Sequence, residues 1–291
     1  MPNKNLIFKI LKKAQKEKFA VGQFNISNLE TIKAIVQAAQ KLKSPVIIGT
    51  SEGESKFIDL DQAVALIRSF REETGLPLFL NLDHGKSSEY IKEAVDSGYD
   101  AVHFDGSKLS LEENIKTAKE IVKYAHKKEI LTEGEISFIG GASEVLEKIP
   151  EIKEEDLTDP EEALRFITET GVDSLAINVG TFHGVDVFGK KPHINLQRLK
   201  EIKNKVGDKV FLVLHGGSGV PEEDIKEAIE SGIVKININT ELRLAFTNTL
   251  KKILEENPKE TTPYKYMPKV IEEVQKVVEE KIQLFGSANK I

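Results

Sequence analysis

Cysteine is absent from the 291-residue sequence. Its absence excludes disulfides, thiolate nucleophiles and thiolate metal ligands. Long hydrophobic runs are also missing, since no apolar stretch approaches the roughly 20 residues that span a bilayer. The first twenty residues are basic and amphipathic but lack the apolar core of a signal peptide, which predicts a helix of the mature chain. Together these features predict a cytoplasmic protein that has no membrane partner.

The chain also has only a small excess of one sign of charge over the other. The chain carries 41 Lys and Arg against 47 Asp and Glu, a formal net charge of -6, and the two signs are interspersed. Without a basic block, a nucleic-acid partner is not expected. An acidic protein that binds an anionic ligand must create positive potential locally, through a metal, a helix N-terminus or backbone amides.

Short apolar runs alternate with amphipathic segments along the whole chain, which is typical of repeated βα units. Strands are expected at Ala20–Phe24, Val46–Thr50, Leu78–Leu82, Ala101–Phe104, Ile130–Ile136, Ser174–Asn178, Val210–Leu214 and Val234–Ile238. Helices are expected at Leu29–Lys41, Leu60–Glu73, Ser88–Ser97, Leu111–Lys127, Pro160–Thr170, Leu196–Val206, Glu222–Ser231, Glu241–Glu256 and Pro268–Phe285. Eight units in a chain of this length favour a closed (β/α)₈ TIM barrel over an open doubly wound sheet.

The barrel is expected to form one domain over residues 1–291, with an N-terminal helix and extra C-terminal helices. No linker divides the chain, and the acidic stretch Glu144–Asp159 is expected to be a loop with a short helix inserted after the fifth strand. In such barrels the active site lies at the C-terminal ends of the strands. The residues at these ends are therefore the candidates for chemistry.

Three histidines lie at the ends of separate strands, and each is followed by glycine. They are His84, His183 and His215. One histidine at a strand end is more often structural, but three that converge on one barrel mouth predict a catalytic metal site with open positions. Zn²⁺ suits three imidazoles best, with Co²⁺, Mn²⁺ and Fe²⁺ as alternatives. His103 lies within a strand, where packing or support of a ligand is expected instead.

Asp83 directly precedes His84, and in an extended chain their side chains would point to opposite faces. Both can face the site only if the chain turns there, which Gly85 would allow. A carboxylate beside a metal-bound substrate suits proton transfer. The alternative is that Asp83 only orients a histidine.

The end of the seventh strand is rich in glycine and predicts an anion site. His215-Gly-Gly-Ser-Gly219 leads into a helix that begins near Glu222. Free backbone N–H groups at such a turn can bind phosphate. A tight turn without a ligand is the alternative, but the neighbouring histidines favour a phosphate site.

These strand ends resemble the class II, metal-dependent fructose- and tagatose-bisphosphate aldolases. The similarity extends from Ala20-Val-Gly-Gln-Phe-Asn-Ile-Ser-Asn-Leu-Glu30 to Phe285-Gly-Ser-Ala-Asn-Lys290. It is carried by Leu82-Asp-His-Gly85, Gly180-Thr-Phe-His-Gly184, Leu214-His-Gly-Gly-Ser-Gly219 and Asn237-Ile-Asn-Thr240. The resemblance implies reversible zinc-dependent cleavage of fructose 1,6-bisphosphate to dihydroxyacetone phosphate and glyceraldehyde 3-phosphate. A homodimer or homotetramer that binds sugar phosphates is also implied, and a monovalent cation can accompany the zinc.

The resemblance also implies roles for individual residues. It places the zinc on His84, His183 and His215, with Glu135 and Asp105 near an alternative metal position. It makes Asp83 the group that exchanges a proton with the C4 hydroxyl. Substrate contacts are implied for Asn25, Ser51, Gly184, Gly216, Ser218, Asn237, Asn239 and Thr240. A Schiff-base role for Lys235 is not expected, because the metal supplies the electron sink.

The sequence departs from the family pattern at three places. Ser143 stands where the family usually has a loop glutamate, so Glu144 is expected to take over proton transfer at C3. Val187 stands where many relatives have a phosphate-binding lysine, and residues 262–267 lack the usual Asp-Pro-Arg. Two alternatives stay open: another ketose phosphate such as tagatose 1,6-bisphosphate, or a metal- and sugar-phosphate-binding protein with little turnover.

Overall fold

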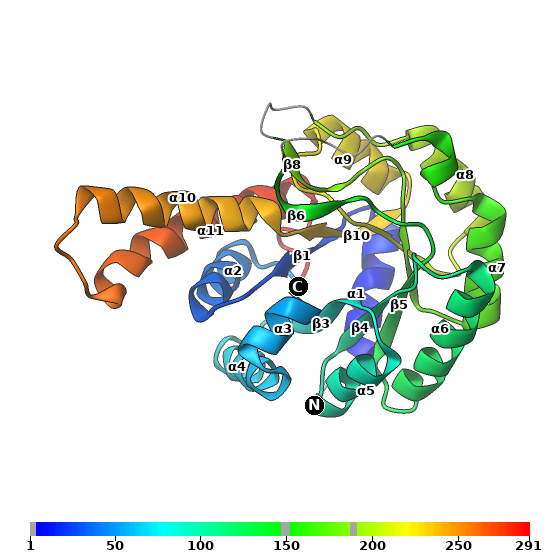
Figure 1. The fold of residues 1–291 in the computed structure, drawn as a ribbon, viewed down its shortest axis with the longest axis horizontal. Coiled ribbons are helices and arrows are strands. Elements are labelled where there is room, and N and C mark those ends of the chain that lie inside the picture. Colours follow the sequence, from blue (N-terminus) through cyan, green and yellow to red (C-terminus); the bar gives the residue numbers. More distant parts are fainter. Residues whose placement is uncertain (1–3, 147–151, 187–190) are drawn as a thin grey trace.

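Eight parallel strands close into a barrel in the computed structural model, which describes residues 4–146, 152–186 and 191–291 (Figure 1). Around the barrel the strands follow the order β1-β10-β9-β7-β5-β4-β3-β2. Their bounds are β1 Val21–Asn25, β2 Val46–Ser51, β3 Leu78–Gly85, β4 Ala101–Asp105, β5 Leu131–Glu135, β7 Ser174–Ile177, β9 Phe211–Leu214 and β10 Ile233–Ile238. The predicted (β/α)₈ barrel is confirmed, and most strand ends differ by one residue from the prediction.

Helices surround the barrel on its outside (Figure 1). They are α2 Leu29–Leu42, α3 Glu52–Ile58, α4 Leu60–Thr74, α5 Ser88–Ser97, α6 Leu111–His126, α7 Pro160–Thr170, α8 Leu196–Val206, α9 Glu222–Glu230, α10 Thr240–Glu256 and α11 Pro263–Leu284. Their apolar faces pack on the outward side chains of the strands and form the larger core cluster. None of the described helices is long and apolar enough to cross a membrane.

The N-terminal helix α1, Lys4–Glu17, closes the bottom of the barrel. Residues two apart on a strand point to the same side, so alternate residues of each strand point into the barrel. The inward-pointing residues nearest the bottom are apolar and form one buried cluster with the apolar face of α1. The cluster consists of Ile7, Ile10, Leu11, Ala14, Phe19, Val21, Ile47, Phe79, Ala101, Leu131, Phe211 and Val234. The bottom of the barrel is therefore a packed core.

Two helices differ from the sequence prediction. Helix α3 was not predicted, because its seven residues are too short to show an amphipathic period. Helix α11 begins at Pro263 instead of Pro268, since the first proline fills the N-terminal position and the second is accommodated inside the helix. Together α10 and α11 form an antiparallel arm that projects from the barrel (Figure 1).

A small parallel sheet lies outside the barrel. It consists of β6, Gly141–Leu146, and β8, His183–Asp186. Both strands were expected to be loop, and in the structure they pair so that Gly141 lies opposite His183. Among the described residues that follow β6, Glu154–Asp156 form a short 3₁₀ helix, in agreement with the short helix predicted in this insertion.

Candidate active site

Above the apolar cluster at the bottom of the barrel, the inward-pointing side chains of the strands are polar. The second level of inward-pointing residues consists of Gln23, Asn81, His103, Glu133 and Lys235. The third level, nearer the mouth of the barrel, consists of Asn25, Asp83, Asp105, Glu135, His215 and Asn237. Nearly all of these side chains are buried. A buried polar layer must be internally hydrogen-bonded or bind a ligand, because unpaired polar groups are costly. The site therefore occupies the C-terminal half of the barrel interior.

The chain turns at the end of β3, as the sequence required, but at a different residue. His84 itself adopts a left-handed conformation with φ 50, whereas Gly85 does not. The backbone N–H of His84 donates to Nδ1 of His103 at 3.1 Å, and the β3–β4 register shifts between Leu82 and Gly85. This turn brings the side chains of Asp83 and His84 to the same site. The prediction that Gly85 supplies the turn was wrong.

Gly85 is required by close packing instead. A Cβ atom at this position would lie 2.6 Å from Cγ1 of Ile91 and 2.9 Å from the backbone oxygen of His103. Both distances are shorter than real Cβ contacts. The glycine therefore lets the last residues of β3 pack directly against β4 and α5.

The three histidines predicted to bind metal meet above the barrel mouth. Nε2 of His84 lies 3.2 Å from Nε2 of His183 and 3.0 Å from Nδ1 of His215. Their opposite ring nitrogens face acceptors: Asp105 at 3.0 Å from His84, the Ile139 carbonyl at 3.2 Å from His183, and Glu133 at 2.9 Å from His215. These acceptors orient the rings so that Nε2 of His84 faces both Nε2 of His183 and Nδ1 of His215.

A cation fits this arrangement. Ring nitrogens at such short separations need a positive charge between them, a proton or a metal ion, because their lone pairs repel each other. Nitrogen ligands of a tetrahedral zinc lie about 3.3 Å apart, which is close to the two separations between His84 and the other two rings. Burial, with the neighbouring His84, lowers the pKa of His215 to about 3 and that of His183 to about 4, so both rings are neutral and ready to bind metal.

Other acidic and histidine side chains form two overlapping groups that could hold a metal. One contains Asp83, His84, His103 and His215, and the other contains His84, Asp105 and Glu135. In the first group His103 is already engaged, because its Nδ1 accepts from His84 and its Nε2 lies 3.3 Å from Glu135. His103 therefore supports the ligands, as the sequence indicated, and the second group matches the expected alternative position.

Asp83 lies in the barrel mouth between two amide donors. Its Oδ2 accepts from Nδ2 of Asn25 at 2.9 Å and its Oδ1 from Nδ2 of Asn237 at 3.1 Å. Burial alone would raise the pKa of Asp83, but the charge of the neighbouring His84 outweighs it and holds the pKa well below its usual range. The carboxylate is therefore ionised and can accept a proton.

A cavity joins these groups to the predicted anion-binding residues. Its lining consists of Asn25, Asp83, His84, His183, Gly184, Gly216, Ser218, Asn237, Asn239 and Thr240. Helix α10 begins at Thr240, and the side chain of Asn239, its N-cap residue, does not cap it; the N–H of Glu241 makes a long bond of 3.5 Å to the Ser218 hydroxyl, which also lines the cavity. A helix N-terminus that opens into a cavity favours an anion. The amide oxygen of Asn237 is buried without a partner, which leaves an acceptor for a ligand hydroxyl.

Some expected contacts lie elsewhere. Ser51 does not line this cavity; it caps α3, and its side chain accepts from the backbone N–H of Glu54. Residues 262–267 lie at the tip of the arm, about 25 Å along α10 from Thr240, so they do not face this chain's own cavity. The backbone of Glu144 belongs to β6, but the side chains of Ser143 and Glu144, and residue Val187, lie outside the described residues.

Sequence analysis missed two charged residues beside the cavity. Glu54 and Arg243 line an adjoining pocket that shares Asn25 and Asn239 with the first one. The signal for Arg243 was its position one helical turn after Asn239, at the start of α10. Glu54 gave no signal, because the short helix that carries it was not predicted.

Lys235 forms a buried ion pair, as expected. Its Nζ lies 2.8 Å from Oε2 of Glu133, whose other oxygen faces His215. Lys235 thus neutralises the carboxylate that orients His215. Its amine is engaged below the cavity and does not line it.

Comparison with known proteins agrees with this geometry. The sequence model of the family "Fructose-bisphosphate aldolase class-II" matches residues 5–290. The crystal structure of the YdjI aldolase from Escherichia coli K12 shares 33% identity and superposes with a TM-score of 0.84, over 98% of both chains. Fructose-bisphosphate aldolase from Campylobacter jejuni shares the fold, with 23% identity and a TM-score of 0.84 over 100% of this chain and 96% of that one. The chain belongs to the class II fructose-bisphosphate aldolase family.

Proposed function

We propose that the protein cleaves the C3–C4 bond of a ketose 1-phosphate reversibly, with fructose 1,6-bisphosphate as its substrate and zinc as its metal. The observation that carries the proposal is the convergence of three histidine ring nitrogens beside an ionised Asp83, in one cavity with the N-terminus of α10. Such a cleavage needs a metal, an acid–base group and an anion-binding site.

His84, His183 and His215 would hold the metal, which when bound acts as a Lewis acid on the carbonyl group of the substrate. Asp83 accepts the proton of the C4 hydroxyl during cleavage and returns it during condensation. The amide donors of Asn25 and Asn237 hold its carboxylate in place. Gly184, Gly216, Ser218 and Thr240 bind the phosphate next to the ketone, and the orphaned amide oxygen of Asn237 receives a substrate hydroxyl.

Proton transfer at C3 is assigned to Glu144. A serine hydroxyl has too high a pKa to serve as a base near neutral pH, which argues against Ser143. This assignment stays a prediction that Glu144→Gln tests: exchange of the C3 proton of dihydroxyacetone phosphate should slow while zinc affinity is kept. Loss of exchange in Ser143→Ala alone would contradict it.

Arg243 is assigned to the distal end of the substrate. It lines the pocket next to Asn239, and residues 262–267, where relatives carry an arginine, lie far from the cavity. One exposed arginine is a weaker phosphate site than the amide-rich cavity, so the ketone-side phosphate should contribute more to binding.

A panel of ketose phosphates tests the proposal. Released triose phosphate is measured with fructose 1,6-bisphosphate, tagatose 1,6-bisphosphate, fructose 1-phosphate and fructose 6-phosphate, before and after chelation and readdition of Zn²⁺ or Co²⁺. We expect chelation to abolish cleavage, zinc to restore it, and kcat/KM to favour fructose 1-phosphate over the 6-phosphate. Full activity in a preparation shown to be metal-free would refute the metal, and a preference for the 6-phosphate would refute the assignment of the cavity. A homodimer or homotetramer also stays a prediction, which light scattering tests.

A further inference from the structure

Glu54 is a largely buried carboxylate beside the cavity that the proposed reaction does not use. Its Oε2 accepts from the backbone N–H of Ser51 at 2.7 Å and from Nδ2 of Asn25 at 3.0 Å. Its Oε1 accepts a longer bond from Nδ2 of Asn239 at 3.3 Å. The carboxylate is thus inserted among polar residues of β1, β2 and the start of α10.

Asn25 connects Glu54 to Asp83. Its amide nitrogen carries two hydrogens, one for Oε2 of Glu54 and one for Oδ2 of Asp83 at 2.9 Å. Its amide oxygen accepts from Nε2 of Gln23 at 3.2 Å. Both donors of this buried amide are therefore committed, and its orientation depends on Glu54.

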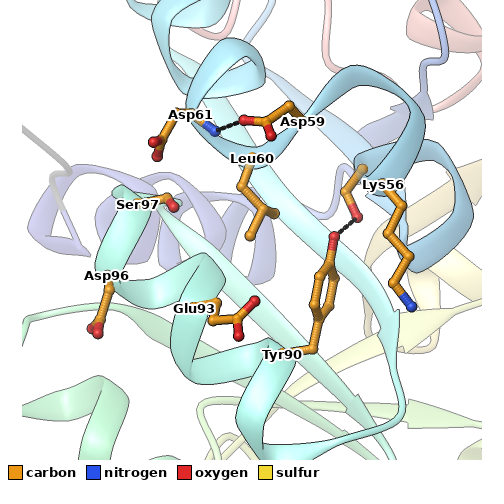
Figure 2. Close-up of a pocket in the computed structure, with 9 residues that line it drawn as sticks. Lys56, Asp59, Leu60, Asp61, Tyr90, Glu93, Asp96 and Ser97 are labelled. Atoms are coloured by element: carbon orange, nitrogen blue, oxygen red, sulfur yellow. Dashed lines mark hydrogen bonds between the residues drawn. The ribbon is translucent and has the colours of Figure 1, made fainter.

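The helix that carries Glu54 is itself firmly attached. Ser55, the next residue, is fully buried, and its hydroxyl lies 2.8 Å from the hydroxyl of Tyr90 on α5. Figure 2 shows this hydrogen bond and the side chain of Lys56 near the same tyrosine, with Nζ 4.9 Å from the ring centroid. Because α3 is held against α5, the position of the Glu54 carboxylate is fixed relative to the barrel.

We propose that Glu54 is a positioning residue for Asp83: it holds the Asn25 amide in the one orientation that directs the Asp83 carboxylate at the substrate. The inference rests on the proposed function, in which Asp83 exchanges a proton with the C4 hydroxyl. Without the Glu54 acceptor, the Asn25 amide is free to turn toward solvent or substrate. Asp83 then loses one of its two amide donors and part of its orientation.

A simpler role for Glu54 is helix capping. It forms a capping box with Ser51, since its carboxylate accepts from the Ser51 N–H and its own N–H donates to the Ser51 hydroxyl. Capping alone would affect stability and not one catalytic step. The chain offers a matched control, because Glu113 forms the same capping box with Ser110 at the exposed start of α6.

The experiment compares two rates in Glu54→Ala and Glu113→Ala. Cleavage of the ketose phosphate needs Asp83, whereas exchange of the C3 proton of dihydroxyacetone phosphate does not involve the C4 hydroxyl. We expect Glu54→Ala to lower kcat for cleavage by about 10- to 100-fold, as a small displacement of a reacting group does. Exchange and bound zinc should keep their parental values. Glu113→Ala should leave both rates unchanged.

Conservative variants sharpen the comparison. Glu54→Gln keeps an oxygen that can accept from Ser51 and Asn25, so most of the cleavage rate should return. Glu54→Asp keeps the charge at the start of α3 but is too short to reach Asn25, so cleavage should fall, and this variant serves if Glu54→Ala does not fold. In an Asn25→Ala background, Glu54→Ala should have no further effect, because the connection is already lost.

The outcomes separate the two proposals. A parental protein that neither releases triose phosphate nor exchanges the C3 proton would refute the proposed function. With an active parent, the role of Glu54 is refuted if Glu54→Ala cleaves at the parental rate, if cleavage and exchange fall together, or if Glu113→Ala loses as much cleavage.

Discussion

Asp83 combines burial, ionisation and two amide donors, which suits it to accept a proton at one defined position. We expect Asp83→Ala to lower kcat by about 10²–10⁴-fold, the usual loss when a general acid–base group is removed. Zinc content should be unchanged, because the three ligand nitrogens belong to other residues. Steady-state cleavage assays with Asp61→Ala, an exposed acid on α4, as control provide the measurement. Parental kcat in Asp83→Ala would show that Asp83 only orients a histidine.

Glu133 lies fully buried between the Lys235 ammonium group and the ring of His215, a proposed metal ligand. It accepts from Lys235 at 2.8 Å and from Nε2 of His215 at 2.9 Å, so it holds the tautomer of His215. The glutamine of Glu133→Gln would present an amide N–H₂ to one of these donors. Zinc affinity should then fall about 10- to 100-fold, as for other partners of metal-binding histidines.

Competition with a chromophoric chelator measures this affinity. Glu120→Gln, on the exposed side of α6, is the control. If Glu133→Gln binds zinc as tightly as the parent, the orientation of His215 comes from packing alone.

Among the elements, the end of β3 has the most demanding geometry. A methyl group at Gly85 would meet Ile91 and the backbone oxygen of His103, and His103 also receives the His84 N–H. We expect Gly85→Ala to lower the free energy of unfolding by about 1–3 kcal/mol, the usual cost of overpacking, and to weaken zinc binding. Denaturant unfolding and zinc titration measure both effects. Gly53→Ala is the control, because a Cβ there meets nothing within 4 Å. Equal stability of both variants would contradict the packing role of Gly85.

The barrel strands were predictable because strands buried on both faces appear as apolar runs, and glycines mark the ends of the preceding helices. The histidines were predictable because a barrel brings strand ends together. Helix α3 and the β6–β8 pair were not, since short segments show no period and their pairing depends on tertiary contacts. The left-handed conformation of His84 was also hidden, because a hydrogen bond to His103, nineteen positions further along the chain, stabilises it.

In the whole molecule, stability and chemistry occupy opposite ends of the barrel. The floor is an apolar cluster sealed by α1, whereas the mouth holds charges and unpaired acceptors. Bound zinc would stabilise the mouth, because it binds the folded protein and not the unfolded chain. At a free zinc concentration of about 100 times Kd this adds about 2.7 kcal/mol to the free energy of unfolding. The gain depends on how many protons zinc must displace.

The last prediction therefore concerns pH. In the folded protein His215 and His183 have pKa values of about 3 and about 4, below the ordinary 6.5 of the unfolded chain. Between these values the unfolded chain binds more protons, so the stability of the metal-free protein falls as pH falls below 6.5. His84 behaves oppositely: burial would lower its pKa, but Asp83 and Asp105 outweigh burial and raise it, so zinc must displace a proton there.

We therefore expect the Tm of the metal-free protein to fall from pH 7 to pH 5, and the rise in Tm on adding zinc to shrink over the same range. Scanning calorimetry at both pH values, with and without zinc, measures both trends. His183→Ala should lose most of the zinc-dependent rise, whereas His193→Gln should keep it, because His193 is exposed and pairs with Asp224. A zinc-dependent rise as large at pH 5 as at pH 7 would mean that no proton competes for the site. That outcome would contradict a protonated His84 among the ligands, because imidazole binds metal only in its unprotonated form, whereas His183 and His215 are already neutral at both pH values.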